Sequence, residues 1–207
     1  HTIGRRQRQM CIRDREILSQ TSLILARGQI QDVGNNQNVN LSEKKYLSII
    51  NAKTAELFRI SCYLPTIITN QDRKTQKIFN DFGFNFGMAF QLSDDILDYF
   101  GNSKKMGKNI GKDFFEGKVT YPIIHCFRKS DKKSKRIIAK LFLKKKRNKK
   151  DLYLILSLMK KTNTYERSAE FVRKFAKKAK SNINKFEGSK YKVYLVELVD
   201  HLIIREK

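Results

Sequence analysis

The sequence predicts an all-α protein, a helical bundle without strands, on three observations. The long segments between Gly and Asn clusters place apolar residues at spacings of three and four rather than alternately. Proline, which interrupts helices, occurs only twice in 207 residues. Hydrophobic residues make up 40% of the chain, which is enough for one sizeable domain with a buried core.

The first fifteen residues, HTIGRRQRQMCIRDR, are rich in arginine and have hardly any apolar periodicity. They do not predict a secretory signal because no apolar stretch follows the charges. The MCIRDR portion resembles translated adapter sequence found in environmental sequencing data. We therefore interpret residues 1–15 as a non-native extension and base the fold on residues 16–207.

Two helices are predicted in the first part of the fold. The first covers residues 16–33 and ends in the turn-rich stretch VGNNQNVN. The second continues to about residue 62, and Asn40 with Glu43 three residues later forms a capping pattern at its start.

Lys53 and Thr54 lie on the apolar face of this second helix. A lysine in an apolar stripe must either reach water or meet an anion, because an unpaired buried ammonium is very costly. The sequence of this helix alone leaves both interpretations open.

The longest uninterrupted helical pattern covers residues 75–100. One face of this helix, about a third of its circumference, passes from small residues to an amide and then to three carboxylates. A glycine inside a helix costs about 1 kcal/mol, so the glycine pair indicates either close packing or an open cavity. The residues on this face are Gly83, Phe84, Gly87, Gln91, Asp94, Asp95 and Asp98.

Three carboxylates therefore stand close together in a chain whose formal net charge is +24. Asp98 follows Asp94 by four residues and Asp95 by three, so we expect all three to converge and to repel one another. Carboxylate oxygens are ligands that Mg²⁺ prefers, usually one or two of them with waters and substrate phosphates. An exposed acidic turn, or an acidic surface paired with lysines, is the alternative.

The loop that follows, GNSKKMGKNIGKDFFEGKVTYP, is basic and rich in glycine. Glycines let the backbone approach a ligand, and lysines supply point charges for phosphate oxygens. Together with the acidic helix, this loop could bind a diphosphate, with a metal bridging to the helix and ammonium groups supplied by the loop. The lysines of the loop are Lys104, Lys105, Lys108, Lys112 and Lys118.

Residues 122–207 are predicted to be helical and structural, with closing helices over 151–160, 165–186 and 190–205. The stretch KKKRNKK (144–150) is expected to form a solvent-facing turn. The 44 Lys and Arg residues against 20 Asp and Glu raise nucleic acid or an anionic membrane as partners. However, Lys, Asn and Ile are abundant along the whole chain, as a coding bias toward A and T would produce, and a solvated basic surface is the simpler interpretation.

The three cysteines have neither metal-ligand nor pairing spacing, which suggests reduced thiols in a cytoplasmic protein. No apolar run approaches the ~20 residues that a membrane span needs.

Three segments resemble one known family. FGMAFQLSDDILDYFG and MGKNIGKDFFEGKVTYPII resemble the second aspartate-rich region of the trans-isoprenyl diphosphate synthases, also called polyprenyl synthetases, and NAKTAELF (51–58) resembles their Lys-Thr segment. The resemblance covers essentially residues 16–207 and implies an isoprenoid-synthase-type helical bundle. The EGK form of the loop is more similar to the long-chain members that make quinone side chains.

The main departure of the sequence from this family concerns its first aspartate-rich motif, and smaller departures are Gln29 and Tyr121. The first aspartate-rich motif of the family and the arginines that follow it have no counterpart here. We therefore expect residues 16–207 to be the C-terminal part of a single synthase domain, to hold one half of a two-sided metal site, and to be inactive alone.

The resemblance implies head-to-tail condensation of an allylic diphosphate with isopentenyl diphosphate, catalysed with Mg²⁺. Its metal ligands would be Asp94, Asp95 and Asp98. The diphosphate would be neutralised by Lys53, Lys108 and Lys118, and Thr54 and Gln91 would present uncharged dipoles to the allylic cation. From the pattern of the helix face alone, we expect Gly83, Phe84 and Gly87 to line the cavity for the growing chain.

The family also implies a homodimer, leaves peripheral membrane association open and suggests no nucleic-acid partner. Three alternatives remain. A terpene cyclase also uses aspartate-rich sites, although it does not need the Lys-rich GKxxGxD loop. The others are a non-catalytic partner subunit of a heteromeric synthase and a basic helical nucleic-acid-binding protein.

Overall fold

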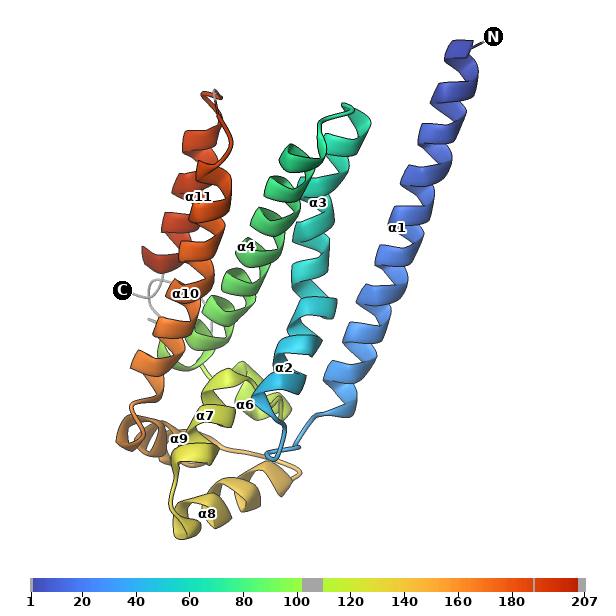
Figure 1. Ribbon diagram of the computed structural model, residues 1–207. Coiled ribbons are helices and arrows are strands. Elements are labelled where there is room, and N and C mark those ends of the chain that lie inside the picture. The colour runs from blue at the N-terminus through green and yellow to red at the C-terminus, as the bar shows by residue number, and fades with distance from the viewer. Residues whose placement is uncertain (1, 102–109, 188, 205–207) are drawn as a thin grey trace.

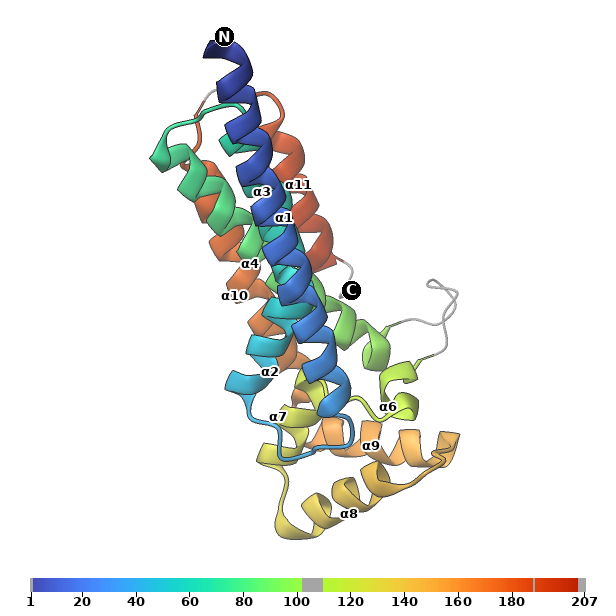
Figure 2. The same cartoon turned by 90° about the vertical axis from the view of Figure 1, so that its right-hand side faces the viewer.

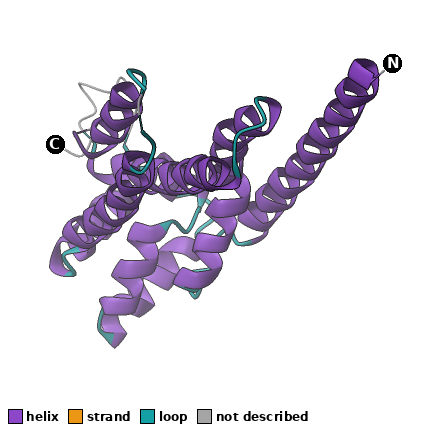
Figure 3. Cartoon of the chain, turned by 45° about the horizontal axis from the view of Figure 1, so that its top comes forward, coloured by secondary structure: helices purple, strands orange, loops and turns teal. Residues whose placement is uncertain are grey.

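The computed structural model describes residues 2–101, 110–187 and 189–204, and every regular element among them is a helix (Figure 3), which confirms the all-α prediction. The predicted phosphate-binding Lys108, with Lys104 and Lys105, lies outside the described residues. The elements are α1 (Thr2–Gly34), α2 (Glu43–Ile50), the π-helix η1 (Asn51–Ala55), α3 (Glu56–Ile68), α4 (Arg73–Phe100), α6 (Lys112–Glu116), α7 (Tyr121–Lys129), α8 (Lys132–Leu143), α9 (Lys149–Lys161), α10 (Thr164–Asn184) and α11 (Lys192–Ile204).

The long helices form a bundle that stands on a base of short ones. α4 packs between α3 and α10, and α11 lies against α10 and α4 (Figure 1). α1 contacts η1, α2 and α3, while its N-terminal end stands away from the bundle (Figures 1 and 3). α8 and α9 lie across the lower end of the bundle (Figure 2).

One hydrophobic core runs from the bundle into the base. Leu92 and Ile96 of α4, Ile123 of α7, Phe142 of α8 and Val172 of α10 are all at most 1% exposed and belong to the same cluster. Burying a side chain of this size stabilises the fold by about 1.5–3 kcal/mol. Because α4 contributes to the core along its length, packing fixes the orientation of the helix that carries the three aspartates.

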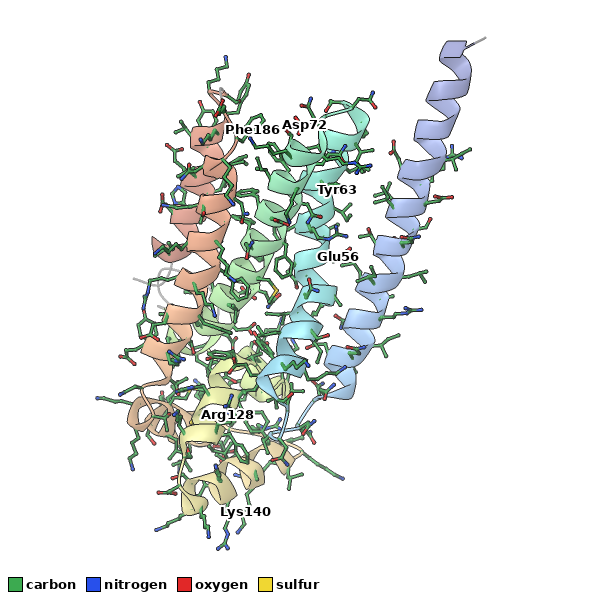
Figure 4. The ribbon with its side chains drawn as sticks, in the orientation of Figure 1. Glu56, Tyr63, Asp72, Arg128, Lys140 and Phe186 are labelled. Atoms are coloured by element: carbon green, nitrogen blue, oxygen red, sulfur yellow. The ribbon has the colours of Figure 1, made fainter. Side chains whose placement is uncertain are left out.

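Side-chain caps define the starts of α2 and α4. Ser42 caps α2, with its hydroxyl oxygen 3.2 Å from the backbone nitrogen of Lys45. The prediction that Asn40 is this cap is wrong, because the helix begins only at Glu43. Asp72 caps α4 at the turn after α3, at the end of the molecule opposite Lys140 of α8 (Figure 4).

The observed boundaries agree with the prediction at the C-terminal end of the chain and differ at the N-terminal end. The three closing helices, α9, α10 and α11, begin and end within about two residues of the predicted ranges. α1 begins at Thr2 rather than at residue 16 and is continuous to Gly34. The interpretation of residues 1–15 as a non-native extension stays a prediction. None of the described helices is long and apolar enough to cross a membrane.

Arg147 is an exception to the predicted solvent-facing turn. Its guanidinium donates to the carbonyl oxygens of Leu141 (3.0 Å), Phe142 and Phe115 (3.2 Å). It also lies over the rings of Phe114 and Phe142, 5.7 and 5.3 Å from their centroids. Arg147 thereby closes the C-terminal end of α8 and holds α6 against it.

Candidate active site

The candidate site begins at the π-helical turn η1, between α2 and α3. The backbone N–H of Glu56 bonds to the carbonyl of Asn51, five residues back, so this turn holds one more residue than an α-helical turn. The extra residue changes the direction of the neighbouring side chains. As a result, Lys53 contacts α1 and Thr54 contacts α4. Such single π-turns are frequent at functional sites.

Four side chains from α2, η1 and α4 form a hydrogen-bonded chain, which we call the relay: Tyr46, Asp95, Gln91 and Thr54. The Thr54 hydroxyl donates to Gln91 Oε1 (2.7 Å), and Gln91 Nε2 donates to Asp95 Oδ1 (2.8 Å). The Tyr46 hydroxyl donates to Asp95 Oδ2. Tyr46 and Asp95 are only 3% and 2% exposed, so the relay is anchored inside the core.

The three predicted metal ligands do not point to one place. Asp94 is exposed, whereas Asp95 is buried with both oxygens engaged in the relay. Asp98 accepts from the backbone N–H of Asp113 at the start of α6 (3.0 Å). No group of three His, Cys, Asp or Glu residues among those described is arranged to hold a metal ion. The expectation that all three carboxylates converge is therefore wrong, because two of them have partners within the protein.

The carboxylates nevertheless form one electrostatic cluster. Burial raises the pKa of Asp95 to about 8, and the charges of Asp113 and Asp94 add to this, while the hydrogen bonds from Tyr46 and Gln91 oppose it. Burial followed by the charge of Asp113 raises the pKa of Asp98 to about 7. Burial raises the pKa of Asp113, and the positive charge of Lys118 opposes this upward shift. A cluster of acids with raised pKa values is a place where added positive charge stabilises the ionised forms.

Lys53 is the first of the predicted diphosphate-binding lysines. Its ammonium lies 2.6 Å from Asp32 Oδ2 of α1, and both side chains are about a quarter exposed. Lys53 therefore meets an anion rather than only reaching water. Of the two interpretations of a lysine in the apolar stripe, the structure therefore supports pairing with an anion.

Lys118 follows the short helix α6. Its ammonium lies 2.6 Å from Glu116 and 3.4 Å from Asp113. The hydrogen bond from Lys118 is the main cause that lowers the pKa of Glu116, and the charge of Lys53 contributes to the same shift. Both lysines, one in η1 and one after α6, thus act electrostatically on Glu116.

Gly83 and Gly87 serve close packing. A Cβ at Gly83 would lie 2.6 Å from the Phe58 carbonyl oxygen, and one at Gly87 would lie 2.6 Å from the Ala55 Cα. Their lack of side chains lets α4 approach α3 and η1, and this approach brings Gln91 to Thr54. Phe84 packs edge-on against Phe175 of α10, with centroids 6.5 Å apart. The structure therefore contradicts the interpretation of these three residues as a cavity lining.

Three residues of the site, Tyr46, Asp32 and Asp113, are not predicted by the sequence patterns. Tyr46 is 49 positions from Asp95 and Asp32 is 21 positions from Lys53, so no local pattern relates the partners. Asp113 is the acidic residue of the GKxxGxD segment. An acidic residue between two glycines of a basic loop was the signal that could have found it.

Comparison with known proteins places the fold among the prenyl diphosphate synthases. The structure superposes on a decaprenyl diphosphate synthase from Rhodobacter capsulatus with a TM-score of 0.88 at 30% identity, covering 95% of this chain and 60% of that one. A polyprenyl synthase from Caulobacter crescentus, solved with calcium and isoprenyl diphosphate, gives 0.87 at 30% identity, covering 94% and 60%.

The sequence agrees with the fold. Residues 5–159 match the family described as polyprenyl synthetase, and the chain belongs to that family. The octaprenyl diphosphate synthase of Haemophilus influenzae is 30% identical over 182 residues, 88% of this chain and 55% of that protein. Component 2 of the heptaprenyl diphosphate synthase of Bacillus subtilis is 32% identical, over 81% of this chain and 47% of that protein. The chain spans about half the length of these relatives.

Proposed function

We propose that this chain carries the diphosphate-binding half of a trans-prenyltransferase. The reaction joins an allylic diphosphate head to tail with isopentenyl diphosphate and gives a polyprenyl diphosphate. The observation that carries this proposal is the arrangement of an acidic cluster and two lysines beside the neutral Thr54–Gln91 pair. A long-chain product, a precursor of quinone side chains, fits the octaprenyl and decaprenyl relatives.

The acidic cluster fits Mg²⁺ as the cofactor. Asp94 is exposed at the C-terminal end of α4, and its charge acts on the partly buried carboxyls of Asp98 and Asp113. Mg²⁺ is usually held by one or two carboxylates together with waters and substrate phosphates, so Asp94 with Asp98 or Asp113 is a sufficient set. A bound Mg²⁺ would act as a Lewis acid on the departing diphosphate. We assign Asp95 to the relay, because both of its oxygens already accept hydrogen bonds.

The lysines would bind the diphosphate by exchanging partners. Lys53 and Lys118 are held by Asp32 and Glu116, and a diphosphate that carries more charge than one carboxylate can displace these partners. Lys108 in the same loop is predicted to join them. Positive groups on the diphosphate stabilise the charge that develops as it leaves.

The uncharged side chains of Thr54 and Gln91 would face the allylic carbocation that forms when the diphosphate leaves. An allylic carbocation beside an ammonium group would be repelled, whereas hydroxyl and amide oxygens attract it. Thr54 and Gln91 supply such oxygens next to the diphosphate-binding lysines. The alkene of isopentenyl diphosphate then attacks the cation, and proton loss from the adduct to the released diphosphate completes the reaction.

The proposal is tested by binding and by turnover. Calorimetry should show Mg²⁺-dependent binding of inorganic diphosphate by the 207-residue chain, and the full-length protein should extend an allylic diphosphate with labelled isopentenyl diphosphate. Asp94→Asn should weaken Mg²⁺-dependent binding by at least about tenfold.

Asp81→Asn is the matched control on the same helix, because Asp81 forms its ion pair with the exposed Lys77. It should bind diphosphate as the wild type does. Binding that needs no Mg²⁺ and is equal in both variants would refute the metal assignment, and robust turnover by residues 1–207 alone would refute the half-site interpretation.

A second candidate function is a subunit of a heteromeric synthase. The observation that favours it is the relative named component 2 of a heptaprenyl diphosphate synthase. This function predicts turnover only when a second, different chain is added. Pull-down from the source organism with mass spectrometry would distinguish it from the homodimer that the family implies.

The remaining partner assignments stay predictions. A basic nucleic-acid-binding role predicts binding that weakens with salt and needs no Mg²⁺. The homodimer, peripheral membrane association and a cytoplasmic location are tested by sedimentation, liposome flotation and cell fractionation.

A further inference from the structure

We propose that the hairpin formed by α8 and α9, at the lower end of the molecule, docks on the surface of an anionic lipid bilayer. Lysines of the hairpin would contact the lipid headgroups, and exposed apolar side chains around its turn would enter the interfacial layer. The inference goes beyond the proposed function and assigns membrane association to one surface of the chain. It can be tested without turnover.

Residues 132–161, which form this hairpin, are strongly basic. They contain 13 Lys or Arg and a single acidic residue, Asp151. Asp151 is buried, and its Oδ1 lies 2.6 Å from the Lys144 ammonium, so its charge is neutralised within the hairpin. The hairpin therefore presents an unbalanced positive surface, which a leaflet of anionic lipid attracts.

Each helix of the hairpin directs one exposed stripe away from the core. In both helices the stripe follows a spacing of four, four and three residues, so its side chains share one face. The opposite faces are buried, with Ile138 of α8 and Ile155 of α9 in the core. The two helices contact each other across the lower end of the bundle, where Lys140 lies (Figures 2 and 4). The stripes consist of Lys132, Arg136, Lys140 and Leu143 in α8, and of Lys149, Tyr153, Ser157 and Lys160 in α9.

Large apolar side chains are exposed at the turn that joins the two stripes. Leu143 ends α8 and is 72% exposed, and Tyr153 near the start of α9 is 67% exposed. Leu154 is also exposed, as is Phe115 of α6, whose carbonyl oxygen accepts from Arg147 in the turn (3.2 Å). Single exposed apolar residues are ordinary, but several around one turn among lysines indicate an interaction surface.

The turn is already ordered in the shape that would dock. Asn148 and Asp151 form a capping box at the start of α9. Arg147 donates to the carbonyl oxygens of Leu141 and Phe142 at the end of α8. Docking therefore does not have to order this segment, which would otherwise cost conformational entropy.

The composition of the hairpin favours a bilayer over a nucleic acid. Eleven of its 13 basic residues are lysines, whereas nucleic acids are typically bound with arginine forks and stacked aromatic rings. A phosphate backbone offers no apolar layer to Leu143 and Leu154, but the boundary between headgroups and acyl chains does. Tyr153 fits the same boundary, because its side chain joins an apolar ring to a polar hydroxyl.

Flotation of the 207-residue chain with lipid vesicles tests the proposal. The wild type should bind phosphatidylcholine vesicles that contain about a third phosphatidylglycerol, and should bind pure phosphatidylcholine at least about tenfold less tightly. Lys145→Gln/Lys146→Gln should weaken binding by about tenfold or more. Leu143→Gln/Tyr153→Gln should weaken it by a similar factor. All four side chains are exposed, so circular dichroism should show unchanged helical content.

Each of these variants has a matched control elsewhere on the surface. Lys74→Gln/Lys177→Gln removes two exposed lysines from α4 and α10, and Tyr194→Gln/Leu198→Gln removes an exposed tyrosine and leucine from α11. Both controls should bind within about twofold of the wild type, because charges far from the bilayer are screened. Hairpin variants that bind as tightly as their controls would overturn the proposal. Loss confined to the lysine variant, with duplex DNA competing against vesicles, would show that the partner is a nucleic acid instead.

Tryptophan fluorescence separates the two partners directly. The chain has no tryptophan, so Tyr153→Trp places a single reporter beside the turn. Its emission should move to shorter wavelength when anionic vesicles are added, whereas that of Tyr194→Trp on α11 should not. Emission of Tyr153→Trp that stays unchanged would refute apolar contact with the bilayer. None of these measurements uses prenyl transfer, so a failure of the proposed function would leave their outcome unaffected.

Discussion

Replacing Gly87 with alanine should destabilise the fold, although alanine is the better helix former. The new Cβ would lie 2.6 Å from the Ala55 Cα and 3.0 Å from the Cβ atoms of Ala55 and Phe58. Carbon atoms in contact prefer about 3.5–4.0 Å, so α4 and η1 would have to separate by about 1 Å.

The expected magnitude combines two opposing terms. Overpacking of a well-packed contact costs about 1–3 kcal/mol, and the Gly to Ala change inside a helix returns about 1 kcal/mol. Separation would also stretch the Thr54–Gln91 hydrogen bond, which lies one turn further along α4 and is worth about 1 kcal/mol. We therefore expect a net loss of about 1–3 kcal/mol in the free energy of unfolding.

Gly34→Ala is the matched control. A Cβ at Gly34 would meet nothing within 4 Å, so this variant should be neutral or up to about 1 kcal/mol more stable. Urea unfolding followed by far-ultraviolet circular dichroism measures both. If Gly87→Ala proves as stable as Gly34→Ala, the close approach of α4 to η1 does not hold in solution.

Three further predictions concern other contacts. Arg147→Met should lower the free energy of unfolding by about 2 kcal/mol, because charged hydrogen bonds to backbone carbonyls are lost; urea titration measures this, with exposed Lys146→Met as the control. Asp32→Asn should lower the Kd for inorganic diphosphate several-fold by removing the competitor of Lys53, and unchanged affinity in calorimetry would contradict partner exchange. Burial lowers the pKa of His125, so its contribution to stability is present above pH ~6.5 and is lost as pH falls; thermal unfolding of His125→Gln should therefore show a smaller loss on acidification than the wild type.

The helices could be predicted from the sequence because their signal is local. Apolar spacing places α4 and the three closing helices close to their observed limits, since each must bury one face. The turn η1 was not predictable in this way. A π-turn differs from an α-turn by one residue, and NAKTA contains no residue type that requires it.

The site was predicted only in part, for a similar reason. Spacing on one helix places Gln91 and Asp95 together, and this pair does form a hydrogen bond. Spacing does not reveal that Tyr46 occupies one oxygen of Asp95, or that Asp98 holds the start of α6 instead of pointing to its neighbours. These contacts depend on how separate elements pack, and their partners are 15 or more positions apart.

The close approach of the helices also constrains how this gene can change. A composition rich in Lys, Asn and Ile indicates pressure toward A and T, which acts against the G-rich codons of glycine. A G to A change in the first two bases of such a codon yields a residue with at least a Cβ. At Gly28 that atom would lie 2.5 Å from the Lys53 backbone nitrogen, as at Gly83 and Gly87 it would meet backbone atoms. We therefore expect selection to retain glycine codons at these three positions despite the pressure toward A and T. At Gly34, where a Cβ would meet nothing within 4 Å, we expect substitutions to be tolerated.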